Sequence, residues 1–146
     1  MKTFVVGDVH GRCAQLHRLL EMLPRDEVSD QLVFLEDLID RGPDAPGCVD
    51  LVMKLQQENP ERVLCLRGNH EQMLLDFIEG SANLWITPVT GGERTFEQYA
   101  GKPLAVTKEQ DLDDARPLAS AHPSLSPPAP CVPAADSLRR AHGGLG

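Results

Sequence analysis

The fold is decided by the stretch TFVVGDVHG, residues 3–11, and by two later segments built in the same way. The second is LVFLEDLIDRG at residues 32–42, and the third is VLCLRGNHE at residues 63–71. Each begins with a short run of apolar and β-branched residues, which favours a buried parallel strand. Each then passes directly into a polar cluster that contains glycine. The pattern predicts three strands, each followed by a loop of potential ligand side chains.

The segments that follow these strands carry the apolar period of amphipathic helices. The repeating apolar positions are Leu16, Leu19, Leu20 and Leu23; Cys48, Leu51, Val52 and Leu55; and Met73, Leu74, Phe77 and Ile78. Pro24 and Pro60 follow the first two helices, Asp44 is placed to cap the second, and Gly80 ends the third. Strands alternating with helices predict an α/β fold: a layered parallel sheet of βαβ units with helices on both faces.

Length, composition and charge exclude several classes of protein. The 146 residues suit one domain with a single core. A net charge of −8 argues against partners such as nucleic acid or an anionic membrane surface. The apolar runs are too short to span a bilayer. The four cysteines, at positions 13, 48, 65 and 131, form no CxxC pair and fall in apolar patterns, so we expect free thiols and a cytoplasmic location.

The last third of the chain differs from the rest. Seven of the twelve prolines lie in residues 101–146, and no strand or helix period survives from residue 115 to residue 135. Such a composition buries too little apolar surface to offset the entropy of ordering the chain. We therefore expect a core over residues 1–100 and a Pro/Ala-rich, poorly structured or divergent tail over residues 101–146.

The three polar clusters are expected to converge, because the carboxyl ends of parallel strands share one edge of a sheet. They would bring together Asp8, His10, Asp37, Asp40, Asn69 and His70. Carboxylate oxygen mixed with imidazole nitrogen suits Mn, Fe or Zn. One carboxylate bridging two ions about 3.5–4 Å apart is a usual way to build a hydrolytic site.

Two further residue types fit such a site. Arg41 and Arg67 carry planar guanidinium groups, which suit phosphate oxygens. Four glycines, at positions 7, 11, 42 and 68, are expected to let the backbone turn sharply and approach ligands closely. The pattern therefore favours metal-assisted chemistry on a phosphate group.

In order and spacing, the three clusters resemble the signature blocks of the calcineurin-like metallophosphoesterases. The similarity is greatest to bacterial and phage serine/threonine protein phosphatases and to symmetrical diadenosine tetraphosphate hydrolases. The later segment TGGERTF, residues 90–96, resembles the Gly-Gly-x-x-Thr segment of the bacterial members. The resemblance covers residues 2–100 and implies a metallophosphoesterase fold with a dinuclear site of two divalent ions, Mn favoured over Fe or Zn.

The resemblance also implies a role for each matched residue. Asp8 and His10 would bind the first ion, Asp37 would bridge both, and Asn69 would bind the second. His70, held by Asp40, would give a proton to the leaving oxygen. Arg41 would clamp the phosphate, and Arg67 would assist substrate binding. The implied substrates are a phosphorylated protein or a nucleotide polyphosphate.

The C-terminal part departs from the family. His142, in the segment HGGL at residues 142–145, resembles a family ligand of the second metal, but the strand that precedes that ligand in the family is replaced by a poor strand former. Glu36 stands where the family has glycine, and a further metal-binding histidine has no counterpart. We therefore expect an incomplete fold at the C-terminus, substoichiometric metal and slow hydrolysis. Three alternatives stay open: a protein phosphatase, a symmetrical diadenosine tetraphosphate hydrolase, or a catalytically silent domain that binds metal or phosphate.

Overall fold

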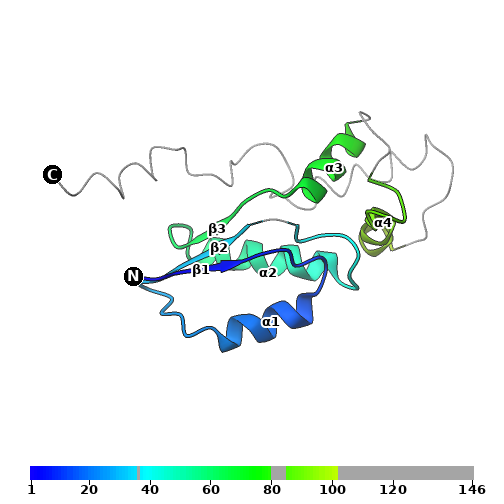
Figure 1. Cartoon of the computed structure of the whole chain (residues 1–146). Coiled ribbons are helices and arrows are strands. Elements are labelled where there is room, and N and C mark those ends of the chain that lie inside the picture. Colours follow the sequence, from blue (N-terminus) through cyan, green and yellow to red (C-terminus); the bar gives the residue numbers. More distant parts are fainter. Residues whose placement is uncertain (36, 80–84, 102–146) are drawn as a thin grey trace.

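The computed structural model describes residues 1–35, 37–79 and 85–101. In these ranges strands and helices alternate and are then followed by two more helices (Figure 1). In chain order the elements are β1 (Thr3–Val6), α1 (Cys13–Met22), β2 (Gln31–Phe34), α2 (Ala45–Glu58), β3 (Val63–Cys65), α3 (Asn69–Ile78) and α4 (Gly92–Ala100). The predicted α/β class with βαβ units and flanking helices is confirmed.

The three described strands form one parallel sheet in the order β1-β2-β3. Val6 pairs with Phe34, and Phe34 pairs with Cys65, so the three strands end side by side. Crossovers of the usual right hand between successive strands in this order place both helices on the same face. Accordingly α1 and α2 lie together below the sheet in Figure 1. In the part of the chain that the structure describes, these two helices therefore share one face of the sheet.

This one-sided arrangement explains the burial of the strands. Leu32 and Phe34 of β2 are fully buried against the helices. Val5 of β1 points to the other side of the pleat and is 56% exposed. The sequence predicts a buried strand over Thr3–Val6; in the structure Val6 is buried, whereas Thr3 and Val5 are exposed.

The helix signals in the sequence are mostly confirmed. Asp44 caps α2, and its Oδ1 accepts a hydrogen bond from the Gly47 backbone N–H at 2.9 Å. The helix α1 ends at Met22, two residues before Pro24. In contrast, α4 was not predicted, because its buried face carries a glycine, a threonine and a phenylalanine instead of a stripe of aliphatic residues.

Some expectations fall outside the described residues. These are Glu36, the helix stop at Gly80, and the tail from residue 102 onward with Cys131 and His142. Cys13, Cys48 and Cys65 are buried free thiols, as expected. Among the described residues, no helix has the length and apolar character needed to cross a membrane.

Candidate metal and phosphate site

The loops that leave the three strands meet at the carboxyl edge of the sheet (Figure 1). The loop after β1 is bonded directly to the loop after β2. The backbone N–H groups of Val9 and His10 both donate to the Asp37 carbonyl, at 3.0 and 2.8 Å, and that of Gly11 donates to Leu38 O at 2.8 Å. The loop after β3 joins them, because the His70 N–H donates to Oδ1 of Asp37 at 3.0 Å. The predicted convergence of the three clusters is therefore present.

A group that could hold a metal ion lies at this junction. One ligand atom each from His10, Asp37 and His70 lies within 4.8 Å of the others. The Nδ1 of His10 is 3.0 Å from the Ile39 carbonyl, which can only accept, so Nδ1 carries the proton and the lone pair lies on Nε2, where Nη1 of Arg41 approaches to 3.0 Å. Imidazole nitrogen and carboxylate oxygen are the donors that Mn, Fe and Zn accept. The donor set fits a divalent transition metal.

The other predicted ligands differ in where they lie. Oδ2 of Asp8 is 3.9 Å from His10 Nε2, at the edge of the donor group, and the side chain is 62% exposed. Asn69 begins α3 and is exposed beside buried His70. His142 is not among the described residues. The structure thus places Asp8 at the edge of the group and Asn69 at the start of α3, directly before His70 in the sequence, while the group itself consists of His10, Asp37 and His70.

His70 is paired with a fully buried carboxylate. Its Nδ1 lies 2.6 Å from Oδ2 of Asp40, and both side chains are almost inaccessible to water. The indole N–H of Trp85 donates to both Asp40 oxygens, at 3.2 and 3.0 Å, and the Thr95 hydroxyl donates to Oδ1 at 2.7 Å. Burial raises the pKa of Asp40 above its ordinary value, and the hydrogen bonds from His70, Thr95 and Trp85 oppose that rise. The pair orients the ring so that Nε2 faces the site.

The two predicted phosphate-binding arginines lie in different surroundings. The guanidinium of Arg41 spans the site, with Nη1 3.0 Å from His10 Nε2 and Nη2 3.3 Å from His70 Nε2. Arg67 is exposed and donates from Nη1 to Gln72 at 3.3 Å. Arg41 therefore lies with the metal-capable group, whereas the contact made by Arg67 is with α3.

The backbone around the site is strained. Four non-glycine residues have positive φ: His10 (47°), Asp37 (46°), Asp40 (70°) and Arg41 (63°). Such conformations are uncommon for side-chain-bearing residues and persist where the surrounding structure holds them. All four belong to the set singled out from the sequence. The strain is concentrated where the candidate chemistry is.

Glu71 holds together two of the loops that carry the site, a role that was not predicted from the sequence. Its Oε1 accepts from the backbone N–H groups of Leu38 and Ile39, at 2.8 and 3.2 Å, and its Oε2 accepts from that of Gly68 at 3.0 Å. It thereby ties the loop after β3 to the loop after β2. A glutamate at the third position of a helix is a capping signal that could have indicated this role.

The glycines divide into those that the site requires and those it does not. A Cβ on Gly68 would lie 2.1 Å from Oδ1 of Asp37 and 2.4 Å from its backbone nitrogen. A Cβ on Gly7 would meet nothing within 4 Å, and Gly7 does not have positive φ. The expectation of a close approach is confirmed at Gly68 and is wrong at Gly7.

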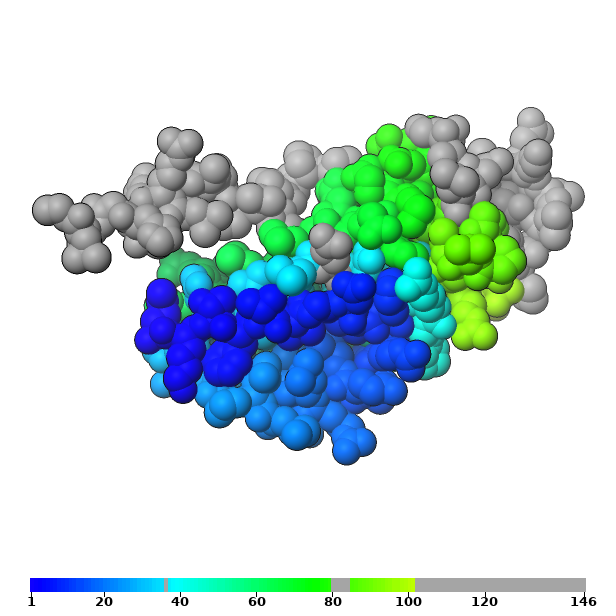
Figure 2. All heavy atoms as spheres, in the orientation of Figure 1, coloured from blue at the N-terminus to red at the C-terminus, as the bar shows by residue number. Residues whose placement is uncertain are grey.

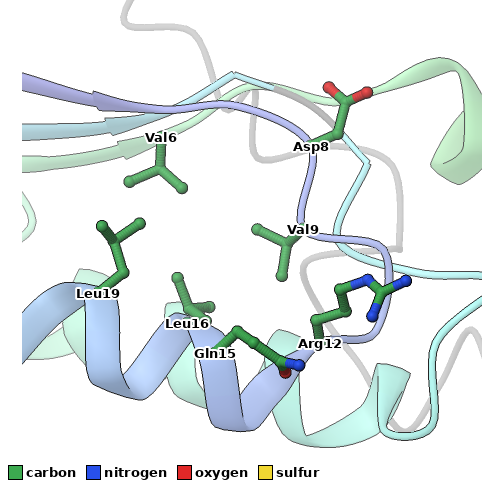
Figure 3. Close-up of a pocket in the computed structure, with 7 residues that line it drawn as sticks. All are labelled: Val6, Asp8, Val9, Arg12, Gln15, Leu16 and Leu19. Atoms are coloured by element: carbon green, nitrogen blue, oxygen red, sulfur yellow. The ribbon is translucent and has the colours of Figure 1, made fainter.

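A separate cavity lies on the other side of the first loop. It has a volume of about 250 Å³ and lies between the end of β1 and α1. Its walls are mainly Val6, Val9, Leu16 and Leu19, and the carboxylate of Asp8 points away from it (Figure 3). None of the three metal-capable residues lines it. The candidate chemistry therefore belongs to the strand-end loops and not to this cavity.

The chain is similar to known phosphoesterases. The family model for calcineurin-like phosphoesterases matches residues 1–129. Serine/threonine-protein phosphatase 1 of Salmonella typhimurium is 41% identical over 91 residues, covering 62% of this chain and 38% of that protein. Serine/threonine-protein phosphatase SIT4 of Candida albicans is 37% identical over 82 residues, covering 52% and 25%.

Relatives named for a nucleotide substrate are almost as similar. The symmetrical bis(5'-nucleosyl)-tetraphosphatase of Dechloromonas aromatica is 37% identical over 82 residues, covering 56% of this chain and 28% of that protein. The chain spans well under half the length of each of these three relatives.

Proposed function

Because the chain belongs to the calcineurin-like phosphoesterase family, we propose that it is a metal-dependent phosphoric ester hydrolase of the serine/threonine protein phosphatase type. One observation carries the proposal. Donor atoms of His10, Asp37 and His70 lie within 4.8 Å of one another, and His70 is bonded to the buried carboxylate of Asp40. This arrangement combines two ligands for a cation, His10 and Asp37, with His70 as a group able to move a proton.

The proposed metal ligands are Asp8, His10, Asp37 and Asn69, with His142 added from the C-terminal segment. We favour two ions of Mn, with Fe or Zn also matching these donors. When bound, such ions supply a nucleophilic water at neutral pH and offset the negative charge of the phosphate oxygens. We propose that Asp37 would serve both ions, because its main-chain carbonyl accepts from the loop after β1 and its Oδ1 accepts from the loop after β3.

The proposed proton donor is His70. With Nδ1 hydrogen-bonded to Asp40, the ring is held with Nε2 toward the site. In the proposed step Nε2 gives its proton to the oxygen that leaves phosphorus, so that an alcohol departs instead of an alkoxide. Asp40 accepts the Nδ1 hydrogen bond and orients the ring.

The proposed phosphate clamp is Arg41. Its two terminal nitrogens are directed to the centre of the site, and a guanidinium can donate two parallel hydrogen bonds to phosphate oxygens. We propose a supporting role in substrate binding for exposed Arg67. Its exposure suits contact with a part of the substrate outside the central site.

For the substrate we propose a phosphorylated serine or threonine side chain in a protein. The second candidate is a symmetrical dinucleotide polyphosphate, which is favoured by the similar identity of the relative named for that activity. We also propose a cytoplasmic location, because three free thiols are buried in the core. Residues 1–100 would form the catalytic core and residues 101–146 a poorly structured tail.

The first experiment measures hydrolysis of p-nitrophenyl phosphate by the full chain with and without Mn²⁺. We expect Mn²⁺ to stimulate turnover and Asp37→Asn to abolish it. The control Asp76→Asn, on α3 and bonded to Gln72, should leave turnover intact. Phosphate binding without turnover would instead identify a catalytically silent domain. Comparing a phosphoserine peptide with diadenosine tetraphosphate then separates the two candidate substrates.

A further inference from the structure

One face of α4 is packed against the strained loop that starts at Asp40. Arg94 donates from Nη1 to the Arg41 carbonyl at 3.1 Å. Gln98 donates from Nε2 to the Gly42 carbonyl at 2.9 Å and accepts from the Ala45 N–H at 2.7 Å. Together with Thr95 these side chains follow the spacing of one helix face. Figure 2 shows α4, in yellow-green, lying directly against the cyan chain of this loop.

The deepest contact of this interface is made with the carboxylate of Asp40. Thr95 bonds to Asp40 twice: its hydroxyl donates to Oδ1 at 2.7 Å and accepts from the Asp40 backbone N–H at 2.9 Å. Trp85 donates its indole N–H to the same carboxylate. Trp85, Thr95 and Asp40 are all 0% exposed. Water is therefore excluded, and the two carboxylate oxygens are oriented by Trp85, Thr95 and His70.

Trp85 reaches this position because Gly92 has no side chain. A Cβ on Gly92 would lie 2.2 Å from the Trp85 carbonyl and 2.7 Å from its indole Nε1. These contacts give a physical reason for the Gly-Gly-x-x-Thr pattern of residues 91–95. Gly92 makes room for the indole, and Thr95 follows one helical turn later to reach Asp40.

We propose that Trp85 and Thr95 are positioning residues for proton transfer: they hold the Asp40 carboxylate in the orientation that directs His70 toward the leaving oxygen. This proposal rests on the proposed function, which assigns the proton transfer to His70. A carboxylate freed from these two donors could rotate about its Cβ–Cγ bond, and the His70 ring would lose its fixed direction. Buried polar groups of this kind are costly unless all are bonded, so the network is a specific arrangement and not a general source of stability.

The activity test compares two leaving groups. Phenyl phosphate needs a proton on its leaving oxygen, whereas 2,4-dinitrophenyl phosphate does not. We expect Thr95→Val and Trp85→Phe to lower kcat for phenyl phosphate about tenfold, with little change in KM and under about twofold change for 2,4-dinitrophenyl phosphate. Thr95→Ser, which restores the hydroxyl, should recover the loss. The control Gln98→Ala loosens the same loop away from the carboxylate, and should affect both substrates equally.

A second measurement does not depend on turnover. In the ¹⁵N-labelled full chain, the Nδ1 proton of His70 should exchange slowly with water, and Thr95→Val should speed that exchange about tenfold or more while Gln98→Ala leaves it unchanged. If the wild-type chain hydrolyses neither ester, the proposed function fails, and the exchange rate still decides the positioning role. Unchanged exchange in Thr95→Val, or equal loss on both esters, overturns the proposal.

Discussion

Gly68 and Asp37 lie so close together that the site has no room for a β-carbon at position 68. A methyl group there would lie 2.1 Å from Oδ1 of Asp37, the same oxygen that accepts the His70 backbone N–H. The carboxylate at the centre of the three loops is therefore positioned by the absence of a side chain on the neighbouring loop.

The first prediction follows from this contact. Gly68→Ala must push Asp37 or the loop aside, so it should destabilise the fold by about 1–3 kcal/mol and weaken Mn²⁺ binding. Gly7→Ala is the matched control, because a Cβ there meets nothing within 4 Å. Urea denaturation and Mn²⁺ titration calorimetry measure both effects. Equal behaviour of the two variants would contradict the argument.

The second prediction concerns Glu71, whose carboxylate accepts three backbone N–H groups from two loops. Glu71→Ala leaves those donors buried without a partner, and we expect a loss of about 3 kcal/mol in the free energy of unfolding. Glu71→Gln keeps one acceptor oxygen and should cost less. Glu61→Ala, at an exposed position, should change stability by less than about 0.5 kcal/mol. A mild effect of Glu71→Ala would show that the loops are held by other contacts.

The third prediction tests the metal-capable group. Asn tolerates the positive φ of His10, so His10→Asn removes the Nε2 donor with little added backbone strain. We expect Mn²⁺ affinity to fall about tenfold or more. His17→Asn replaces an exposed histidine on α1 and should leave the affinity unchanged. Isothermal titration with Mn²⁺ alone makes the comparison, and equal affinities would remove His10 from the ligand set.

The fourth prediction is a pH dependence far from the site. Asp30 accepts hydrogen bonds from the backbone N–H groups of Lys2 and Asp26, at 2.6 and 3.2 Å, and these bonds lower its pKa. Because the folded pKa lies below the unfolded value, the stabilising contribution is complete above about pH 4 and is lost as the pH falls through the folded pKa. Wild-type and Asp30→Asn should therefore differ in unfolding free energy at pH 7 and approach each other in acid. A constant difference across this range would mean that ionisation of Asp30 is not the cause.

The sequence predicted the elements of the sheet and the residues at its edge for a local reason. Each of these signals lies within a short stretch of sequence: the periods of the strands and helices, the Asp44 cap and the three polar clusters. The carboxyl ends of parallel strands then meet through general geometry, so His10, Asp37 and His70 could be placed together from the pattern alone.

The sequence did not predict that Trp85 and Thr95 would hydrogen-bond to the buried carboxylate of Asp40. Trp85 and Thr95 reach Asp40 across 45 and 55 residues, and α4 carries no apolar stripe that marks it as a helix. The exposure of Val5 and the common face of α1 and α2 were also missed. The order of the strands and the handedness of the crossovers between them decide these features, and both are properties of the assembled sheet.

The amino-acid order alone thus specified the ligand types, their spacing and the strands that carry them, because each is encoded within one short segment. Only the tertiary structure decided which carboxylate is desolvated, which ring nitrogen faces the site and where a glycine is obligatory. Those properties arise from contacts between segments far apart in the chain. Burial and hydrogen-bond geometry exist only after those segments have packed together.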